Sequence, residues 1–439
     1  MKLIDKIKST VFNHRALKEK ILPLVVFLLP VIIILGIFMG YPVIYTIMRS
    51  FYDKANNFVG LQNYVRIFNN PRMLTALRNN ALWVAIVPII VTSLGLIFAV
   101  LTEKIGWAGL FKIILFIPLV VSGLAAGVIF RFMYANDPSV GFLNATTQAI
   151  VHTVQPPGLY PDAVTTMRDD IAQQDGGFIL KETVEPGENA NFGLARISPE
   201  LIPDNAKQVQ TEINGQEGIN GVVWLDYSRG GGIRGQPEKG ETGLPGVRVD
   251  LLSSEGEVVK TTYSNENGTY SFNNVAQGQY DIRLNKSTFR KPFGGFYWLG
   301  PRLVVPAVMF AYIWISTGLS LIIIKAGLSS INRSYMEAAR IAGASEFQVF
   351  RYVTVPLLFP VLMVVFIRTV ISVLKVFDLV LVIAPESVQA NATVLALEMW
   401  RASFGGMRDF GLGSALATIL FLLILPVVYF NIKRFRLND

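Results

Sequence analysis

Long stretches without a charged residue constrain this chain more than any other feature of its sequence. Five such windows cover residues 21–48, 79–102, 113–130, 303–324 and 410–432, and each is 18 to 28 residues long. About 20 apolar residues cross a bilayer as one helix. A sixth window, residues 357–383, is apolar in bulk but contains Arg368, Lys375 and Asp378. The sequence therefore predicts six transmembrane helices and excludes a purely soluble protein.

The net charge of +8 divides unevenly along the chain. Residues 138–289 hold 11 Lys and Arg against 19 Asp and Glu, a balance of −8, whereas the remainder holds 28 against 12, or +16. Basic residues beside membrane spans mark the cytoplasmic side. Because the first 20 residues and the C-terminal Lys433, Arg434 and Arg436 are basic, we expect both termini in the cytoplasm and the acidic stretch outside.

These observations predict an all-α polytopic membrane domain interrupted by an extracytoplasmic domain. We assign residues 1–20 to a cytoplasmic basic N-terminus and 21–134 to transmembrane helices 1–3. Residues 135–292 form the insert, and 293–439 hold transmembrane helices 4–6 with a cytoplasmic loop at 334–356. The expected location is a bacterial plasma (inner) membrane, crossed several times.

The insert has two parts of different character. Up to about residue 210 it mixes short helical patterns, such as 162–174, with extended pieces such as 178–184. From about 215 to 285 apolar and polar residues alternate in short runs, and turn signals lie at Glu255-Gly256 and Asn267-Gly268. This pattern predicts β-hairpins in a sandwich.

The runs 221–226, 243–249, 268–272 and 278–282 resemble a prealbumin-type β-sandwich module of bacterial surface adhesins. Some relatives of that module bind calcium, and Asp226, Glu238 and Glu241 could supply oxygen ligands; solvated loop carboxylates are the alternative.

Several kinds of chemistry are excluded by residues that the chain lacks. It has no cysteine, and its two histidines, His14 and His152, lie far apart in the sequence. A thiol site, a Ser-His-Asp triad and a His-rich metal site are therefore not expected. No G-x-x-x-x-G-K-[ST] phosphate loop occurs, so ATP would have to be hydrolysed by another chain. We expect no enzyme activity and no cofactor bound by this chain.

The most informative motif lies in the cytoplasmic loop. Ser334 with Glu337, and Ser345 with Gln348, have the spacing of helix capping boxes, and Gly343 lies where a first helix would need a left-handed residue. The loop therefore predicts a helix-turn-helix on the inner membrane face.

The same loop resembles the EAA motif of binding-protein-dependent ABC importers. The matching positions are Glu337, Ala338, Ala339, Gly343 and Pro356, with Val353 and Val355 at the branched apolar positions. In that family the loop is the coupling helix, which docks on a cytoplasmic ATPase. The alternative is that Glu337 only caps its own helix.

The resemblance is to the maltose-type sugar permease and also includes residues 58–64, 326–331 and 375–379. It implies a permease subunit that translocates a sugar, of oligosaccharide size. It implies as partners a second EAA-type permease subunit, a cytoplasmic ABC ATPase dimer that binds ATP, and an extracytoplasmic solute-binding protein. The remaining alternatives are an importer for another polar solute, such as a glycerol phosphate derivative, and a membrane-anchored adhesin or receptor that uses the β-module.

A candidate substrate path lies on the fifth span. Arg368, Ile371, Lys375 and Asp378 recur at spacings of three, four and three, which places them on one helix face. A charged side chain facing lipid costs roughly 2.5–3.5 kcal/mol at the bilayer centre. We therefore expect this face to point to the subunit interface. The alternative is a Lys375–Asp378 ion pair that only neutralises itself.

The resemblance to the maltose-type permease adds to this path. It implies that Lys375 and Asp378 match sugar-binding positions, that Ile371 and Leu374 match neighbouring contacts, and that Ser316 and Leu319 match a second group on the preceding span. Arg368 is expected to be structural or gating.

Overall fold

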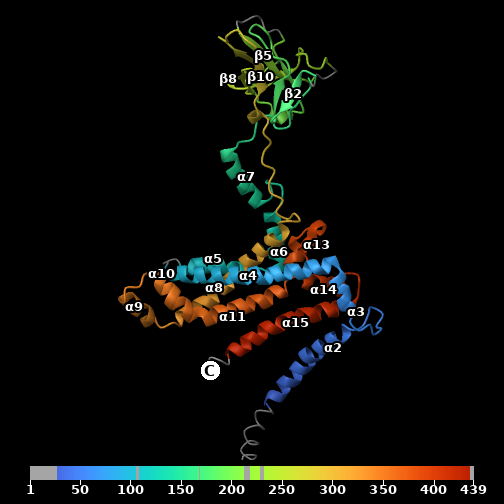
Figure 1. Cartoon of the computed structure of the whole chain (residues 1–439), viewed down its shortest axis with the longest axis vertical. Coiled ribbons are helices and arrows are strands. Elements are labelled where there is room, and N and C mark those ends of the chain that lie inside the picture. Colours follow the sequence, from blue (N-terminus) through green and yellow to red (C-terminus); the bar gives the residue numbers. More distant parts are fainter. Residues whose placement is uncertain (1–26, 105–107, 168, 212–217, 228–231, 436–439) are drawn as a thin grey trace, which may run out of the picture. The chain divides into compact units, whose positions relative to one another are not determined.

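The computed structural model describes residues 27–104, 108–167, 169–211, 218–227 and 232–435 (Figure 1). The chain forms two compact units, one comprising Met1–Tyr134 with Tyr297–Asp439 and the other Ala135–Phe296. The first unit is helical and the second is rich in β-structure. The basic N-terminus assigned to residues 1–20 lies outside the described residues.

The first unit consists of helices, and the second unit interrupts it along the chain between residues 134 and 297. In chain order the helices are the span Phe27–Arg49, which contains the π-helical turn η1 (Gly36–Gly40) and α2 (Tyr41–Arg49), then α3 (Gln62–Asn69), α4 (Pro71–Lys104), α5 (Ala108–Val120), α6 (Gly123–Met133), α8 (Val304–Ser329), α9 (Arg333–Ile341), α10 (Glu346–Val349), the π-helical turn η4 (Phe350–Thr354), α11 (Val355–Leu374), α12 (Asp378–Ile383), α13 (Gln389–Ala392), α14 (Leu395–Phe404) and α15 (Phe410–Phe435).

Among the described residues, five helices are long and apolar enough to cross a membrane, and a bent pair raises the number to six if it counts as one span. The bent pair is Ile113–Val120 and Gly123–Met133, with an angle of 109° between its halves. The sequence predicted one uninterrupted span over 113–130, and the structure corrects this. The break arises because Ser122 has extended backbone and caps α6, accepting a hydrogen bond from Ala125 N at 3.2 Å.

The span predicted over 357–383 is also divided. Helix α11 ends at Leu374, with Lys375 as its C-cap, and α12 begins at Asp378. Two short-range backbone bonds close the end of α11, from Lys375 N to Ser372 O and from Val376 N to Val373 O. A cation after a helix C-terminus and an anion at a helix N-terminus are both favoured by the helix dipole. Lys375 and Asp378, whose spacing suggested one charged helix face, thus lie at the C-terminus of α11 and at the N-terminus of α12.

Small residues allow the helices of the first unit to pack closely. A Cβ at Gly95 of α4 would lie 2.9 Å from Ser320 Cβ of α8, and one at Gly318 of α8 would lie 2.1 Å from Leu115 O of α5. Close helix contacts through small residues are typical of membrane helices, where van der Waals packing drives association. Ala99, Leu321, Leu358 and other buried residues of α4, α8 and α11 form one core there.

The second unit is a helix followed by two packed sheets. Its elements are α7 (Phe142–Val154), β1 (Val164–Thr165), β2 (Ile171–Gln174), β3 (Gly177–Leu180), β4 (Phe192–Ala195), a 3-10 turn (Pro199–Leu201), β5 (Ile219–Leu225), β6 (Thr242–Gly243), β7 (Arg248–Leu252), β8 (Val258–Tyr263), β9 (Thr269–Phe272), β10 (Asp281–Leu284) and a second 3-10 turn (Lys286–Thr288). Asn144 of α7 ties the ends of the unit together, since it donates to Ala135 O and Phe296 O and accepts from Phe296 N.

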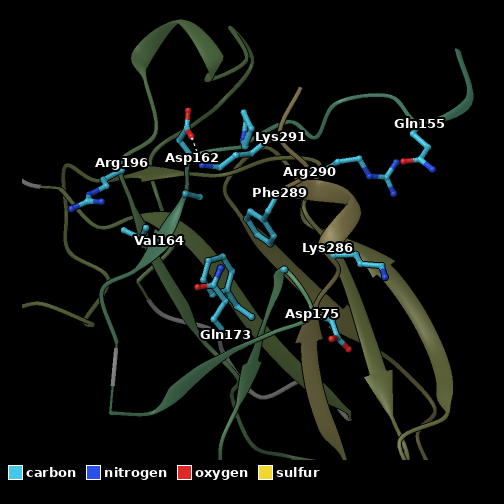
Figure 2. Close-up of a pocket in the computed structure, with 14 residues that line it drawn as sticks. Gln155, Asp162, Val164, Gln173, Asp175, Arg196, Lys286, Phe289, Arg290 and Lys291 are labelled. Atoms are coloured by element: carbon cyan, nitrogen blue, oxygen red, sulfur yellow. Dashed lines mark ion pairs between the residues drawn. The ribbon is translucent and has the colours of Figure 1, made fainter. Parts of the chain in front are cut away.

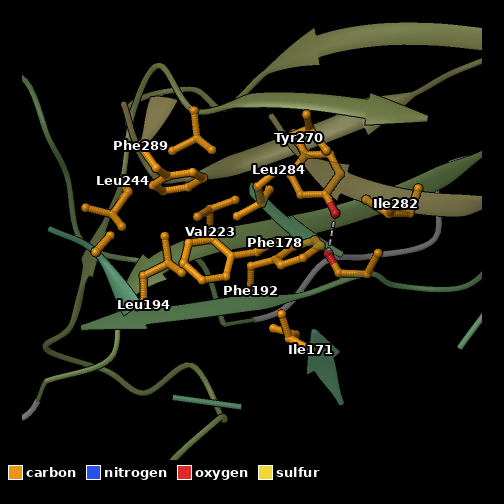
Figure 3. Close-up of a cluster of buried hydrophobic side chains, with 14 of the residues drawn as sticks. Ile171, Phe178, Phe192, Leu194, Val223, Leu244, Tyr270, Ile282, Leu284 and Phe289 are labelled. Atoms are coloured by element: carbon orange, nitrogen blue, oxygen red, sulfur yellow. Dashed lines mark hydrogen bonds between the residues drawn. The ribbon is translucent and has the colours of Figure 1, made fainter. Parts of the chain in front are cut away.

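The strands form a sandwich. One sheet has the order β1-β4-β5-β6 with β9 also paired to β5, and the other has the order β2-β3-β10-β7-β8. All pairs are antiparallel except β4 with β5. Between the sheets lies an apolar core in which Phe178, Phe192, Val223, Leu251 and Ile282 are almost fully buried (Figure 3). The sandwich thus includes strands from 164–195 as well as the predicted 215–285.

Two local predictions for the insert are wrong. Residues 162–174, expected to contain a helical pattern, form β1 and β2, because their apolar Ile171 joins the sandwich core. Asn267-Gly268 does not connect a hairpin, since β8 pairs with β7 while β9 pairs with β5. The turn carries the chain from one sheet to the other instead, and Gly268 has the positive φ of +80° that such a tight turn needs.

A buried carboxylate joins three neighbouring strands of the second sheet. Asp250 of β7 has a fully buried side chain. Its Oδ1 accepts hydrogen bonds from Arg248 Nε at 3.0 Å and Thr261 Oγ1 at 2.9 Å, and its Oδ2 accepts from Arg283 and Asn285. Burial raises the pKa of this carboxyl, but the hydrogen bonds from Asn285, Thr261 and Arg248 and the charge of Arg248 outweigh burial and hold it below the usual value.

Candidate functional site

The loop between α8 and α11 forms two short helices joined by a tight turn. Helix α9 ends at Ile341, and Gly343 follows with φ +89°. Gly343 N donates to Arg340 O at 2.9 Å and Ala344 N to Ala339 O at 3.0 Å, which is the bonding pattern of a Schellman motif. The Arg340–Glu346 ion pair, at 2.7 Å, bridges the two helices. The predicted helix-turn-helix is confirmed.

The capping of these helices agrees with the sequence in one case and differs in the other. Ser345 and Gln348 form the expected capping box of α10. Helix α9 is instead capped by Asn332, whose Oδ1 accepts from Ser334 N at 3.0 Å, so the predicted Ser334–Glu337 capping box is wrong. Asn is as good an N-cap as Ser, and it comes two residues earlier. The Glu337 side chain is exposed and makes no capping bond within the described residues.

The surface of this loop is unusually apolar for an exposed segment. Ile341 is 88% exposed, Tyr352 70% and Phe347 68%, and Tyr335 is also exposed. Of the EAA-type positions, Glu337, Ala338 and Gly343 are exposed and Ala339 is half-buried, while Pro356 lies in the first turn of α11. Several large, exposed apolar side chains on one short loop are typical of a segment that binds a partner.

The residues of the candidate substrate path come from α8, α11 and α12. Ser316, Leu319, Ile371 and Asp378 are half-buried, Leu374 is buried at 3% exposure and Lys375 is exposed. Lys375 and Asp378 do not form an ion pair, because they lie on either side of the break between α11 and α12. The self-neutralising pair considered from the sequence is therefore not formed.

Asp378 instead lies at the bend of the third span. A Cβ built on Gly123, the first residue of α6, would lie 2.1 Å from Asp378 Oδ2, so the carboxylate sits directly against that helix start. The N-terminus of a helix carries a partial positive charge that stabilises an anion. Next to it, Gly127 of α6 packs against Val382 of α12. The Asp378 charge is thus stabilised by the bent span.

Two further residues join this polar region. The Tyr312 hydroxyl of α8 lies close to the side chains of Ser316 and Ser372, with the charged groups of Arg368 and Asp378 in the same region. The Tyr312 ring lies edge-on to Trp83 of α4, with centroids 5.5 Å apart. Tyr312 and Ser372 were not among the residues predicted from the sequence, although Tyr312 precedes the predicted Ser316 by one helical turn.

The carboxylates considered for calcium are engaged by the protein itself. Asp226 accepts hydrogen bonds from Thr166 and from Gly235 N, and Glu241 accepts from Glu238 N. Glu241 is 3% exposed, and burial raises its pKa. Within the described part of the chain, no group of three His, Cys, Asp or Glu side chains is arranged to hold a metal ion.

Comparison with known proteins finds similarities for the C-terminal helical part of the chain and for the β-rich part of the insert. Residues 275–435 match the family "Binding-protein-dependent transport system inner membrane component", and residues 217–292 match the SdrD B-like domain. The chain is 26% identical to the osmoprotective compounds uptake permease protein GgtC of Synechocystis, over 93% of this chain and 98% of that protein. It is 25% identical to the alpha-glucoside transport system permease protein AglF of Rhizobium meliloti, over 93% and 80% of the two chains.

A shorter sequence similarity and a structural similarity accompany these matches. The trehalose/maltose transport system permease protein MalF of Thermococcus litoralis is 36% identical over 32% of this chain and 48% of that protein. The fold matches a chain of a bacterial ABC transporter involved in the import of the acidic polysaccharide alginate, with a TM-score of 0.56 and 15% identity over 96% and 97% of the two chains. At that identity the match shows the fold alone. The C-terminal helical part of this chain, residues 275–435, therefore matches the inner membrane components of binding-protein-dependent transport systems, and a β-sandwich domain is inserted after the third apolar segment of the chain.

Proposed function

We propose that this chain is the transmembrane permease subunit of an ABC importer that translocates a sugar of oligosaccharide size. The observation that carries the proposal is the exposed apolar surface of α9 and α10, on a loop with the spacing of the EAA motif. Relatives named as alpha-glucoside, trehalose/maltose and lactose permeases support a sugar as the substrate.

The importer assembles from this chain and three kinds of partner. A cytoplasmic ABC ATPase dimer binds and hydrolyses ATP and docks on Glu337, Ala338, Ala339 and Gly343, while Pro356 sets the start of α11. A second EAA-type permease subunit completes the path. An extracytoplasmic solute-binding protein delivers the sugar; in support, a structure of the same fold holds a pentasaccharide-bound periplasmic protein. This chain itself binds no cofactor.

The chain crosses a bacterial inner membrane with both termini in the cytoplasm and the β-sandwich outside. The sugar passes along Ser316, Leu319, Ile371, Leu374, Lys375 and Asp378. Tyr312 and Ser372 add hydroxyl groups to this route, since the Tyr312 hydroxyl lies close to both Ser316 and Ser372. Hydroxyl groups suit a sugar because each can both donate and accept a hydrogen bond.

A second candidate substrate is a smaller polar solute, such as a compatible osmolyte or a glycerol phosphate derivative. The similarity to GgtC over 93% of this chain favours this alternative. The use of the β-module as a membrane-anchored adhesin has less support, because a single span would be enough to anchor it.

Reconstitution tests the proposal. The chain is assembled with its ATPase, second permease and binding protein in proteoliposomes, and sugar uptake is measured together with ATP hydrolysis. Ile341→Asp and Phe347→Ser each place polarity on the apolar surface and are expected to lower binding-protein-stimulated hydrolysis by about tenfold. Tyr227→Ser, which removes an equally exposed aromatic side chain in the insert, is the matched control. If the binding protein stimulates ATP hydrolysis fully in both loop variants, α9 and α10 are not the surface on which the ATPase docks.

A further inference from the structure

The insert contains a cavity that the importer function does not use. Its volume is about 880 Å³, within the range of about 300–1,000 Å³ typical of ligand pockets (Figure 2). It is lined by residues from 155–164, from the β2–β3 hairpin and from 286–291, together with Arg196. Segments 155–164 and 286–291 are those by which the chain enters and leaves the sandwich.

The cavity is basic although the insert is acidic. Its lining includes four cations, Arg196, Lys286, Arg290 and Lys291, and two carboxylates, Asp162 and Asp175. Residues 138–289 have a balance of −8, so this concentration of positive charge is local.

Most of this charge is not neutralised. Lys291 is paired with Asp162 at 3.4 Å, and the Arg290 guanidinium donates weakly to Pro156 O at 3.5 Å. Neither Arg196 nor Lys286 has a carboxylate within 4.0 Å among the described residues. Donors of this kind are available to an anionic ligand.

Arg196 is held in an unfavourable backbone conformation. It directly follows β4 and has φ +60°, a left-handed conformation that costs a residue other than glycine about 1–3 kcal/mol. Such residues cluster at binding and catalytic sites. The strain therefore agrees with a functional position for Arg196 at the cavity.

From this lining we propose that the cavity binds a carboxylated oligosaccharide. Lys286, Arg196 and Arg290 can each donate to a sugar carboxylate. Gln155, Gln173, Asp162 and Asp175 can each form a hydrogen bond with a sugar hydroxyl. The two aspartates would also repel a ligand as densely charged as polyphosphate. Phe289, which is 7% exposed and belongs to the sandwich core, lines the cavity between these polar groups and adds a small apolar contact for the C–H groups of a sugar (Figure 2).

This inference rests on the proposed function, because it assigns anionic saccharides to a site on a sugar importer. It is tested by binding alone, so that its failure can be distinguished from a failure of transport. The full chain in lipid nanodiscs, without its partners, is titrated calorimetrically with a uronic acid tetrasaccharide. A neutral glucose tetrasaccharide and inorganic tetraphosphate are the comparison ligands.

We expect the uronic acid tetrasaccharide to bind at least about tenfold more tightly than either comparison ligand. Arg196→Gln and Lys286→Gln should each weaken this binding about tenfold or more, since each removes a charge-assisted hydrogen bond. Lys239→Gln, an exposed lysine outside the cavity, is the matched control. Arg196→Lys keeps the positive charge and should retain most of the binding. Comparing it with Arg196→Gln distinguishes the loss of a ligand contact from the loss of the folded insert.

Several results would overturn the proposal. Equal binding of the neutral tetrasaccharide, tighter binding of tetraphosphate, or unchanged binding in both glutamine variants would each do so. The proposal would also be overturned if the chain bound no saccharide and the glutamine variants lost association with the solute-binding protein. That result would assign the cations to a protein partner. Uptake of a neutral sugar by the assembled importer bears on the proposed function only.

Discussion

The turn after α9 offers a sharp test of the coupling loop. Gly343 has φ +89°, and a Cβ there would meet no atom within 4 Å. A substitution therefore acts through the backbone and not through a steric clash. Valine in a left-handed conformation costs about 1–3 kcal/mol, which at about 1.4 kcal/mol per tenfold shifts the turn roughly 5- to 150-fold towards other conformations.

Gly343→Val should lower the sugar transported per ATP hydrolysed, because the angle between α9 and α10 would no longer be fixed. Gly343→Asn is the control, since asparagine tolerates the left-handed region and keeps both bonds of the Schellman motif. Uptake of labelled sugar and phosphate release are measured in the same proteoliposomes, with membrane insertion checked by protease accessibility. Identical ratios in the wild type, the valine variant and the asparagine variant would refute a role for this turn in coupling.

Three further outcomes are expected. Asp378→Ala should lower the initial rate of uptake about two- to fivefold, because α6 loses an anion that contributes about 0.3–1 kcal/mol at its N-terminus. If uptake is unchanged in both Asp378→Ala and Lys375→Ala, these two residues do not line the substrate path. Asp250→Ala should destabilise the insert by about 1–3 kcal/mol, because Thr261 and Asn285 lose a buried acceptor and the partly exposed Arg248 and Arg283 lose their ion-pair partner. Because the folded pKa of Asp250 is lowered, the contribution of its charge is present above about pH 4 and is lost as pH falls below that value, which thermal unfolding followed by circular dichroism would detect. Replacing 135–296 by a short linker should weaken uptake at low binding-protein concentration, whereas unchanged uptake and binding-protein affinity would favour a purely structural insert.

Features set by local physics could be predicted from the sequence. The apolar windows identify the spans because a helix must satisfy its own backbone in lipid, whatever its neighbours are. The Ser345–Gln348 capping box and the left-handed Gly343 depend only on residues within one turn of the chain. The EAA spacing predicted a resemblance to binding-protein-dependent importers, and residues 275–435 match the inner membrane component of such systems.

What the tertiary structure decided depends on residues far apart in the sequence. The Lys375–Asp378 segment fits one continuous helix by its spacing, and only the packing of α12 on α6 places the Asp378 carboxylate against Gly123. Likewise, Asn267-Gly268 is a good hairpin turn by composition, but the pairing of β9 with β5 sends the chain to the other sheet. The basic cavity, too, is assembled from segments more than 100 residues apart. Local patterns specify where helices and strands can form, and long-range packing selects which of them meet.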